Sequence, residues 1–229
     1  MHHLPAPLIW LLIVLAASAL VWMYRRDLGR IRRRRAAFFS ASLELFQSCR
    51  VIQDGLGYPV LEGRYRGFQV KLEPVLDQIA WRKIPSLWLK ATVLQANPHA
   101  GVFDLMMRPQ GTEFYSPGGD LEHRVRTPAA WPAEAVIRTD DPDAMPGLDL
   151  IAPHMALFAE PRMKELLVTP LGTRLVRQVW QAQRATYAVL RQAEFEEHVL
   201  EPGLARSLLD AAIDVGRSLA APAPLLKAS

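Results

Sequence analysis

Apolar residues fill the first part of the chain without interruption. From Leu4 to Tyr24 there is no charged side chain, and Trp10 lies near one end of this stretch while Trp22 lies near the other, next to Tyr24. At about 1.5 Å per residue, about 21 helical residues extend roughly 31 Å, which matches a hydrocarbon core of about 30 Å. Aromatic rings at both ends are typical of the membrane–water interface. The pattern predicts a transmembrane anchor over residues 1–24.

A cluster of arginines follows the apolar stretch directly and forms a basic juxtamembrane collar over residues 25–35. Asp27 is the only acid among them, and the basic residues are Arg25, Arg26, Arg30, Arg32, Arg33, Arg34 and Arg35. Positive charge beside a span stays on the cytoplasmic side, so we predict single-pass membrane localisation with the amino terminus outside and the domain in the cytoplasm. The alternative is a cleaved signal peptide with Ala17-Ser18-Ala19 as its site, but a secretory signal carries its charge before the apolar run.

Beyond the collar, the pattern changes from a helical to a strand period. Apolar positions recur every three to four residues over 36–53, which predicts a helix. Phe68, Val70 and Leu72 then alternate with polar residues, and a run over 60–65 precedes them, which predicts a β-hairpin. The short connections favour an antiparallel, meander-like sheet. Further strands are predicted over 87–95, 102–108, 135–138 and 165–169.

The carboxyl-terminal third again has a helical period. From Leu175 to Ala193 apolar residues recur at steps of three and four, with Thr173 as N-cap, and a second amphipathic segment follows over 204–219. Two helices joined by a short turn form a hairpin on a sheet. We therefore predict an α+β fold with one N-terminal transmembrane helix, a cytoplasm-facing domain over 36–219 with an antiparallel meander-like sheet and a C-terminal helical hairpin, and a frayed tail over 220–229.

Charge is distributed unevenly along the chain. The whole sequence has a formal net charge of +4, but residues 36–229 carry 20 Lys+Arg and 22 Asp+Glu, so the basicity belongs to the collar. A slightly acidic domain has no global electrostatic attraction to phosphate backbones, so no nucleic-acid partner is predicted. Cys49 is the only cysteine. It excludes an intramolecular disulfide and agrees with a reducing compartment.

The sequence contains none of the phosphate-loop, zinc-protease, nucleophile-elbow or paired-cysteine motifs. We therefore predict no catalytic residue and no cofactor. The densest carboxylate group, Asp140, Asp141 and Asp143, is a weak candidate for a metal site, because hard cations need several converging oxygens. The competing interpretation of these aspartates is a solvated turn.

Four arginines recur along the predicted helix of the carboxyl-terminal third. They are Arg174, Arg177, Arg184 and Arg191. On one helix they would share a face opposite the apolar stripe, which predicts a surface for a partner or for lipid headgroups. The alternative is a solvated outer face.

These patterns favour a non-catalytic protein. We predict a membrane-anchored scaffold, assembly or regulatory accessory subunit of a membrane-associated complex, with the lipid bilayer and membrane-protein subunits as partners and protein–protein interaction as its activity. The alternatives are a membrane-tethered enzyme acting on a lipid-linked or phosphorylated substrate, and a small-ligand sensor domain.

Overall fold

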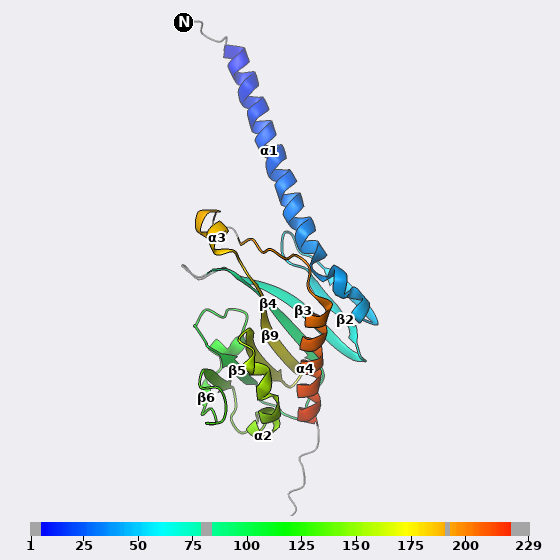
Figure 1. The fold of residues 1–229 in the computed structure, drawn as a ribbon, viewed down its shortest axis with the longest axis vertical. Helices are drawn as coiled ribbons and strands as arrows, with labels where there is room; N and C mark the ends of the chain where they lie inside the picture. Colours follow the sequence, from blue (N-terminus) through cyan, green and yellow to red (C-terminus); the bar gives the residue numbers. More distant parts are fainter. Residues whose placement is uncertain (1–5, 79–83, 191–192, 221–229) are drawn as a thin grey trace, which may run out of the picture.

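The fold is an antiparallel sheet combined with helices, seen in a computed structural model that describes residues 6–78, 84–190 and 193–220 (Figure 1). The α-helices are α1 (Ala6–Ala36), α2 (Leu148–Ile151), α3 (Arg184–Leu190) and α4 (Pro202–Ala220), and the 3₁₀ helices are η1 (Ala37–Leu45), η2 (Pro117–Gly119) and η3 (Ala152–Ala159). The strands are β1 (Ser48–Ile52), β2 (Val60–Tyr65), β3 (Phe68–Asp77), β4 (Ser86–Leu94), β5 (Phe103–Met107), β6 (His123–Val125), β7 (Ala135–Thr139), β8 (Met163–Thr169) and β9 (Gly172–Gln181). The α+β character and the antiparallel sheet agree with the expectation.

The nine strands form one sheet in the order β1-β2-β3-β4-β9-β8-β5-β7-β6. Strands β2, β3 and β4 follow one another as a meander, as expected. Strand β1, whose residues were expected to be helical, extends this meander at its edge, and β5, the expected next strand, does not pair with β4. The hairpin of β2 and β3 turns at Arg66 and Gly67, both with positive φ. The β8–β9 hairpin then inserts between β4 and β5, pairing with β4 on one side and with β5 on the other. The β8–β9 hairpin therefore joins the group β1 to β4 to the group β5, β7 and β6, and both groups precede it in the sequence.

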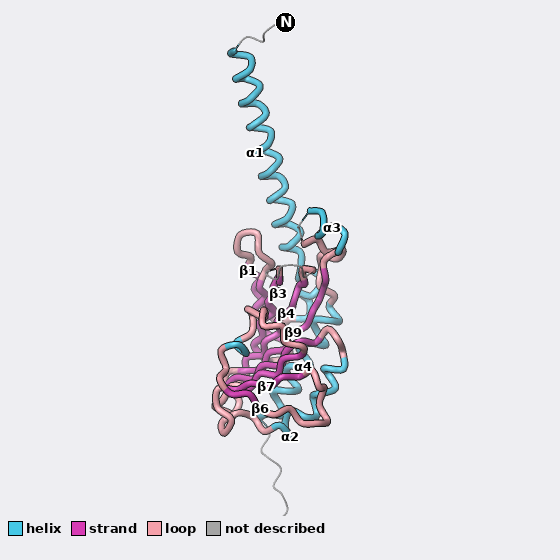
Figure 2. Tube along the Cα trace, turned by 90° about the vertical axis from the view of Figure 1, so that its left-hand side faces the viewer, coloured by secondary structure: helices cyan, strands magenta, loops and turns pink. Residues whose placement is uncertain are grey.

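One face of the sheet carries the apolar core. Helix α4 contacts β4 and β9 on this face, and Figure 2 shows it running beside the strands. Its buried residues include Leu209, Ala212 and Ile213, which lie in the same cluster as Phe103 and Leu105 of β5. The predicted second amphipathic helix is thus confirmed, because three- and four-residue spacing places these side chains on one side of α4.

Two predicted helices are correct only in part, over η1 and over α3. Residues 48–52 of the helix expected over 36–53 form the edge strand β1, and the helix expected from Thr173 is strand β9 followed by the short α3. β9 is paired on both sides and both of its faces are covered, so its apolar residues do not alternate, and Leu175, Val176 and Val179 imitate a helical stripe. The predicted helical hairpin is therefore replaced by α4 alone packing on the sheet.

The expectation of a transmembrane anchor also requires correction. Among the described residues, no helix combines the length and the apolar character that crossing a membrane requires. Residues 6–24 of the apolar stretch and the arginine collar belong to one uninterrupted helix, α1. The finding contradicts the predicted anchor over 1–24, the single-pass localisation and the orientation with a cytoplasmic domain. The predicted frayed tail falls outside the described residues from 221 onward.

Candidate functional site

Helix α1 projects away from the rest of the chain in both views (Figure 1; Figure 2). Its large apolar side chains are exposed. Trp10 is 67% exposed, and the predicted interface residues Trp22 and Tyr24 are 61% and 65% exposed. The other large exposed apolar residues of α1 are Leu8, Leu11, Leu12, Ile13, Val14, Leu15, Leu20, Val21 and Met23. We call this segment the apolar arm. Apolar side chains of this size and number mark a surface that another molecule covers.

The base of the arm is fixed to the domain by polar contacts. Arg35 donates to the Leu56 carbonyl at 2.7 Å and its guanidinium lies 5.0 Å from the centre of the Tyr58 ring, while Gln53 donates to the Arg32 carbonyl at 3.1 Å. Burial raises the pKa of Tyr58, and the neighbouring Arg35 opposes this shift. The arm is therefore attached to the domain at a defined position.

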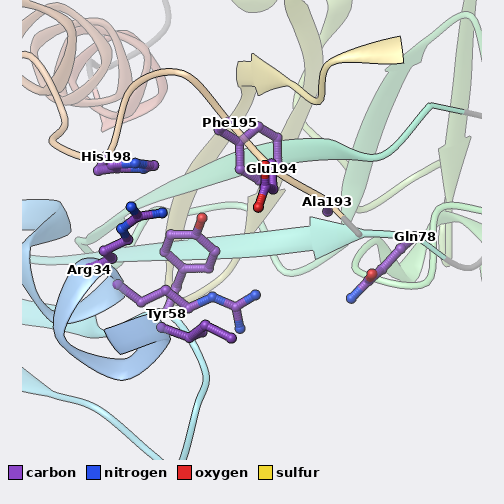
Figure 3. Close-up of a pocket in the computed structure, with 9 residues that line it drawn as sticks. Arg34, Tyr58, Gln78, Ala193, Glu194, Phe195 and His198 are labelled. Carbon is purple, nitrogen blue, oxygen red and sulfur yellow. The ribbon is translucent and has the colours of Figure 1, made fainter. Parts of the chain in front are cut away.

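A pocket of about 310 Å³ lies at this base, between the end of α1 and the segment before α4 (Figure 3). Arg34 and His198 lie on one side of the view, and Tyr58 and Glu194 point into the space between the elements. The predicted collar residues are thus brought together on the last turns of α1, with Arg34 and Arg35 lining the pocket. Sequence reasoning did not identify Tyr58 or His198 as their neighbours.

The three described arginines of the second predicted group do not share one helix. Arg174 and Arg177 lie in β9, Arg184 lies in α3, and Arg191 lies outside the described residues. Arg174 donates to the carboxylate of Glu165, and Arg177 pairs with Glu160. The predicted helix face is therefore wrong, because the residues that would form it belong to a strand and to a separate short helix.

The aspartates around position 140 shape a turn. Asp140 Oδ1 accepts from the Val102 amide at 2.7 Å, and Asp141 Oδ1 accepts from the Asp143 amide at 2.9 Å. These carboxylates thus satisfy loop amides, as Asx turns do. No group of three His, Cys, Asp or Glu residues that could hold a metal ion occurs within the described part of the chain.

The strongest unexpected feature is a group of charged residues buried on the face of the sheet opposite α4. Glu165 is fully buried and receives three hydrogen bonds of 3.1 to 3.3 Å from Arg174. Asp104 is 1% exposed and lies beside Glu165. We call these three residues the buried charge cluster. Burial, and then the Glu165 carboxylate, raise the pKa of Asp104 to about 8.

The segment 109–121 covers the buried charge cluster. Tyr115 packs against Trp88 with ring centres 5.9 Å apart, and a Cβ at Gly118 would lie 2.1 Å from Asp104 Oδ2. Lys164 holds this segment through Glu113 at 2.8 Å. Its close approach to Asp104 requires glycine at position 118. Segment 109–121 therefore forms a fitted cover on this face of the sheet.

Sequence reasoning missed this cluster although a signal was present. Asp104 stands in the run Val-Phe-Asp-Leu-Met-Met, and Glu165 precedes Leu-Leu-Val, so each places a charge inside an apolar strand. A charged residue on a buried strand needs a partner. The pairing itself was invisible, because the two strands are about sixty residues apart in the sequence and meet only through the β5–β8 pairing.

Comparison with known proteins assigns no family. No protein-family model matches the chain, and no curated protein matches it. A solved structure described as the crystal structure of the mycobacterial trehalose monomycolate transport factor A, TtfA, is similar at 14% sequence identity, covering 87% of this chain and 99% of that chain with a TM-score of 0.38. A likeness of this degree carries no argument about function.

Proposed function

We propose that this protein is a non-catalytic assembly or scaffold subunit that binds its partners through the apolar arm. The observation that carries the proposal is the exposure of apolar side chains on α1. Covering one large apolar side chain contributes about 1.5 to 3 kcal/mol, so a partner that covers several of them gains a large association energy. The domain behind the arm has its own buried core, so it does not need the arm for that core.

The partner that fits this surface has apolar helices next to an acidic group. Apolar side chains occupy α1 up to Tyr24, and the arginine collar begins immediately after them. A bound helix would therefore meet apolar contacts along the arm and positive charge at its base. Membrane-protein subunits have apolar helices that end in polar loops, and we propose subunits of this class as the partners. Electrostatic complementarity at the collar would set the orientation of the complex.

Photo-crosslinking in the native cell tests this proposal. A photoreactive amino acid at Leu12, in the middle of the arm, should yield discrete adducts with one or a few proteins. The matched control places it at Leu171, which is 75% exposed in the β8–β9 turn. It should yield no matching adduct, because this position has the exposure without the arm. The proposal would be contradicted if the photoreactive residue at Leu12 gave no protein adduct, or if both positions gave adducts in equal amounts.

The collar provides a second arm of the test. Replacing Arg30 and Arg33 by glutamate should lower co-purification of the crosslinked partner by about tenfold, which corresponds to about 1.4 kcal/mol. The matched control is Arg64→Glu, an exposed arginine of β2 on the domain. An equal effect of both changes would show that the total charge of the protein, and not the collar, decides association.

A further inference from the structure

A pocket lies between the sheet and segment 109–121, beside the buried charge cluster. It has a volume of about 680 Å³, which is in the range of small-molecule sites. Its floor is the face of β5, β7 and β6 opposite α4, and segment 109–121 lines the other side. This pocket is separate from the one at the base of α1 and from the surface of the apolar arm.

The strand register places complementary groups along the pocket floor. Asp104 of β5 is paired with Arg138 of β7, and Arg138 is paired with Arg124 of β6. Neighbouring paired side chains on one face have Cβ atoms about 5 Å apart, so one carboxyl group and two guanidinium groups form a row. Met106 and Val136 are paired in the same way and form an apolar floor beside this row.

Two buried oxygens at this pocket have no hydrogen-bond partner among the described residues. They are Asp104 Oδ1 and Thr112 Oγ1. Leaving a buried polar atom without a partner costs about 1 to 3 kcal/mol, which a ligand with a hydrogen-bond donor would recover. Asp104 is 1% exposed and its carboxyl group also interacts with the side chains of Glu165 and Ser116, so its Oδ1 atom belongs to the interior of the fold and not to the surface.

The two arginines retain free donors. Arg138 donates to the Leu121 carbonyl at 3.1 Å and has further guanidinium donors, and the exposed Arg124 side chain has no hydrogen bond or ion pair within the described part of the chain. Of the acidic residues that line the pocket, Glu113 is engaged with Lys164, and Asp120 is exposed at the rim. Guanidinium groups bind carboxylates through paired hydrogen bonds.

We propose that this pocket binds a small carboxylic acid that carries an amino or hydroxyl group next to the acid and a short apolar chain. The donor group binds Asp104 Oδ1, the carboxylate binds Arg138 and Arg124, and the apolar chain packs on Met106 and Val136. Amino acids and hydroxy acids share this chemistry. The inference is independent of the proposed assembly function, because it uses neither the arm nor the collar.

Calorimetric titration of the full-length protein in mild detergent tests the site with three probes of one shape. They are L-leucine, 2-hydroxy-4-methylpentanoate and 4-methylpentanoate, which differ only in an amino group, a hydroxyl group or neither. At least one of the first two should bind at least about tenfold more tightly than 4-methylpentanoate. Equal affinity of all three, or no binding of any up to about 10 mM, would overturn the proposal.

Variants locate the site and identify the donor. Arg124→Gln should weaken binding about tenfold, whereas the matched change Arg126→Gln, at an exposed arginine that does not line the pocket, should not. Equal effects of these two surface changes would overturn the proposal. If the donor is an ammonium group, binding should release a proton from the Asp104–Glu165 pair, and Asp104→Asn should abolish the release. If the donor is a hydroxyl group, no proton should be released, because Asp104 stays neutral.

Discussion

The apolar arm and the buried charge cluster reverse the usual distribution of residues in opposite ways. The arm places large apolar side chains outside the protein, with Trp10 at 67% exposure, whereas the cluster places Asp104 and Glu165 at 1% and 0% exposure. Each arrangement is unfavourable by itself, since water is a poor environment for apolar groups and the protein interior is a poor one for charges. Within the structure, the buried Glu165 carboxylate has a partner of opposite charge, whereas the apolar side chains of the arm are exposed.

The cluster is resolved within the chain. Arg174 donates three hydrogen bonds to Glu165, and Ser116 of segment 109–121 lies against Asp104. The apolar side chains of the arm are exposed, and the hydrogen bonds between α1 and the domain lie at its base. The comparison teaches that charged residues buried inside the domain are held by partners within the fold. Apolar residues exposed on the arm are available for association with another molecule.

Removal of Glu165 should give the largest loss of stability. Glu165→Ala leaves the Arg174 guanidinium, whose side chain is 16% exposed, without its partner, and we expect the free energy of unfolding to fall by about 3 to 5 kcal/mol. The control Glu62→Ala removes a 42% exposed partner of Arg50, whose side chain is 71% exposed, and should cost less than about 1 kcal/mol. Urea denaturation measures both, and equal losses would contradict the contrast between buried and exposed pairs.

A pair of tryptophans compares the two regions directly. Trp88 is 8% exposed and packs against Tyr115 and Val176, so Trp88→Ala should lower the free energy of unfolding by about 3 kcal/mol. Trp10→Ala on the arm should change it by less than about 0.5 kcal/mol, because an exposed side chain loses few contacts. Thermal or urea unfolding checks the pair, and a large effect of Trp10→Ala would show that the arm packs on the domain.

Two adjacent glycines test the fit of segment 109–121. Gly118→Ala would bring a Cβ against the carboxylate of the buried Asp104, and we expect a loss of about 2 kcal/mol. Gly119→Ala meets no atom within 4 Å and should change stability by less than about 0.5 kcal/mol. If both substitutions are neutral in denaturation measurements, the segment does not sit tightly on the cluster.

The pH dependence of stability should be the smallest of these effects when it is expressed per pH unit. The pKa of Asp104 is raised from 3.8 to about 8 by burial and by Glu165, so the folded state holds a proton that the unfolded chain releases. This contribution is complete below the unfolded pKa and is lost as the pH rises through the folded pKa. The free energy of unfolding should therefore fall between about pH 4 and pH 8, by at most about 1.4 kcal/mol per pH unit.

Asp104→Asn should flatten this slope in urea denaturation measured between about pH 5 and pH 8. The control Asp120→Asn changes an exposed carboxylate of the same pocket and should leave the slope in place. A slope that persists in Asp104→Asn would assign the titration to another group.

Elements with local patterns were predictable from the sequence. The alternation of Phe68, Val70 and Leu72 identified β3, and the spacing of Leu208, Leu209 and Ala212 identified α4, because each has one buried and one wet face. β9 has two covered faces, so its period was misread. The apolar run of residues 4–24 was equally clear as a pattern, but its length alone did not decide that it crosses a membrane.

The sequence by itself determined the hairpin of β2 and β3, strand β4, helix α4, the apolar arm and the position of the arginine collar on it. These follow from side chains that are neighbours along the chain. Only the tertiary structure decided that β9 is a strand and that Arg174 forms an ion pair with Glu165. It also decided that Asp104, Arg138 and Arg124 form one row. These features depend on pairing between strands that are distant in the sequence. The local sequence pattern does not show which strands pair through hydrogen bonds.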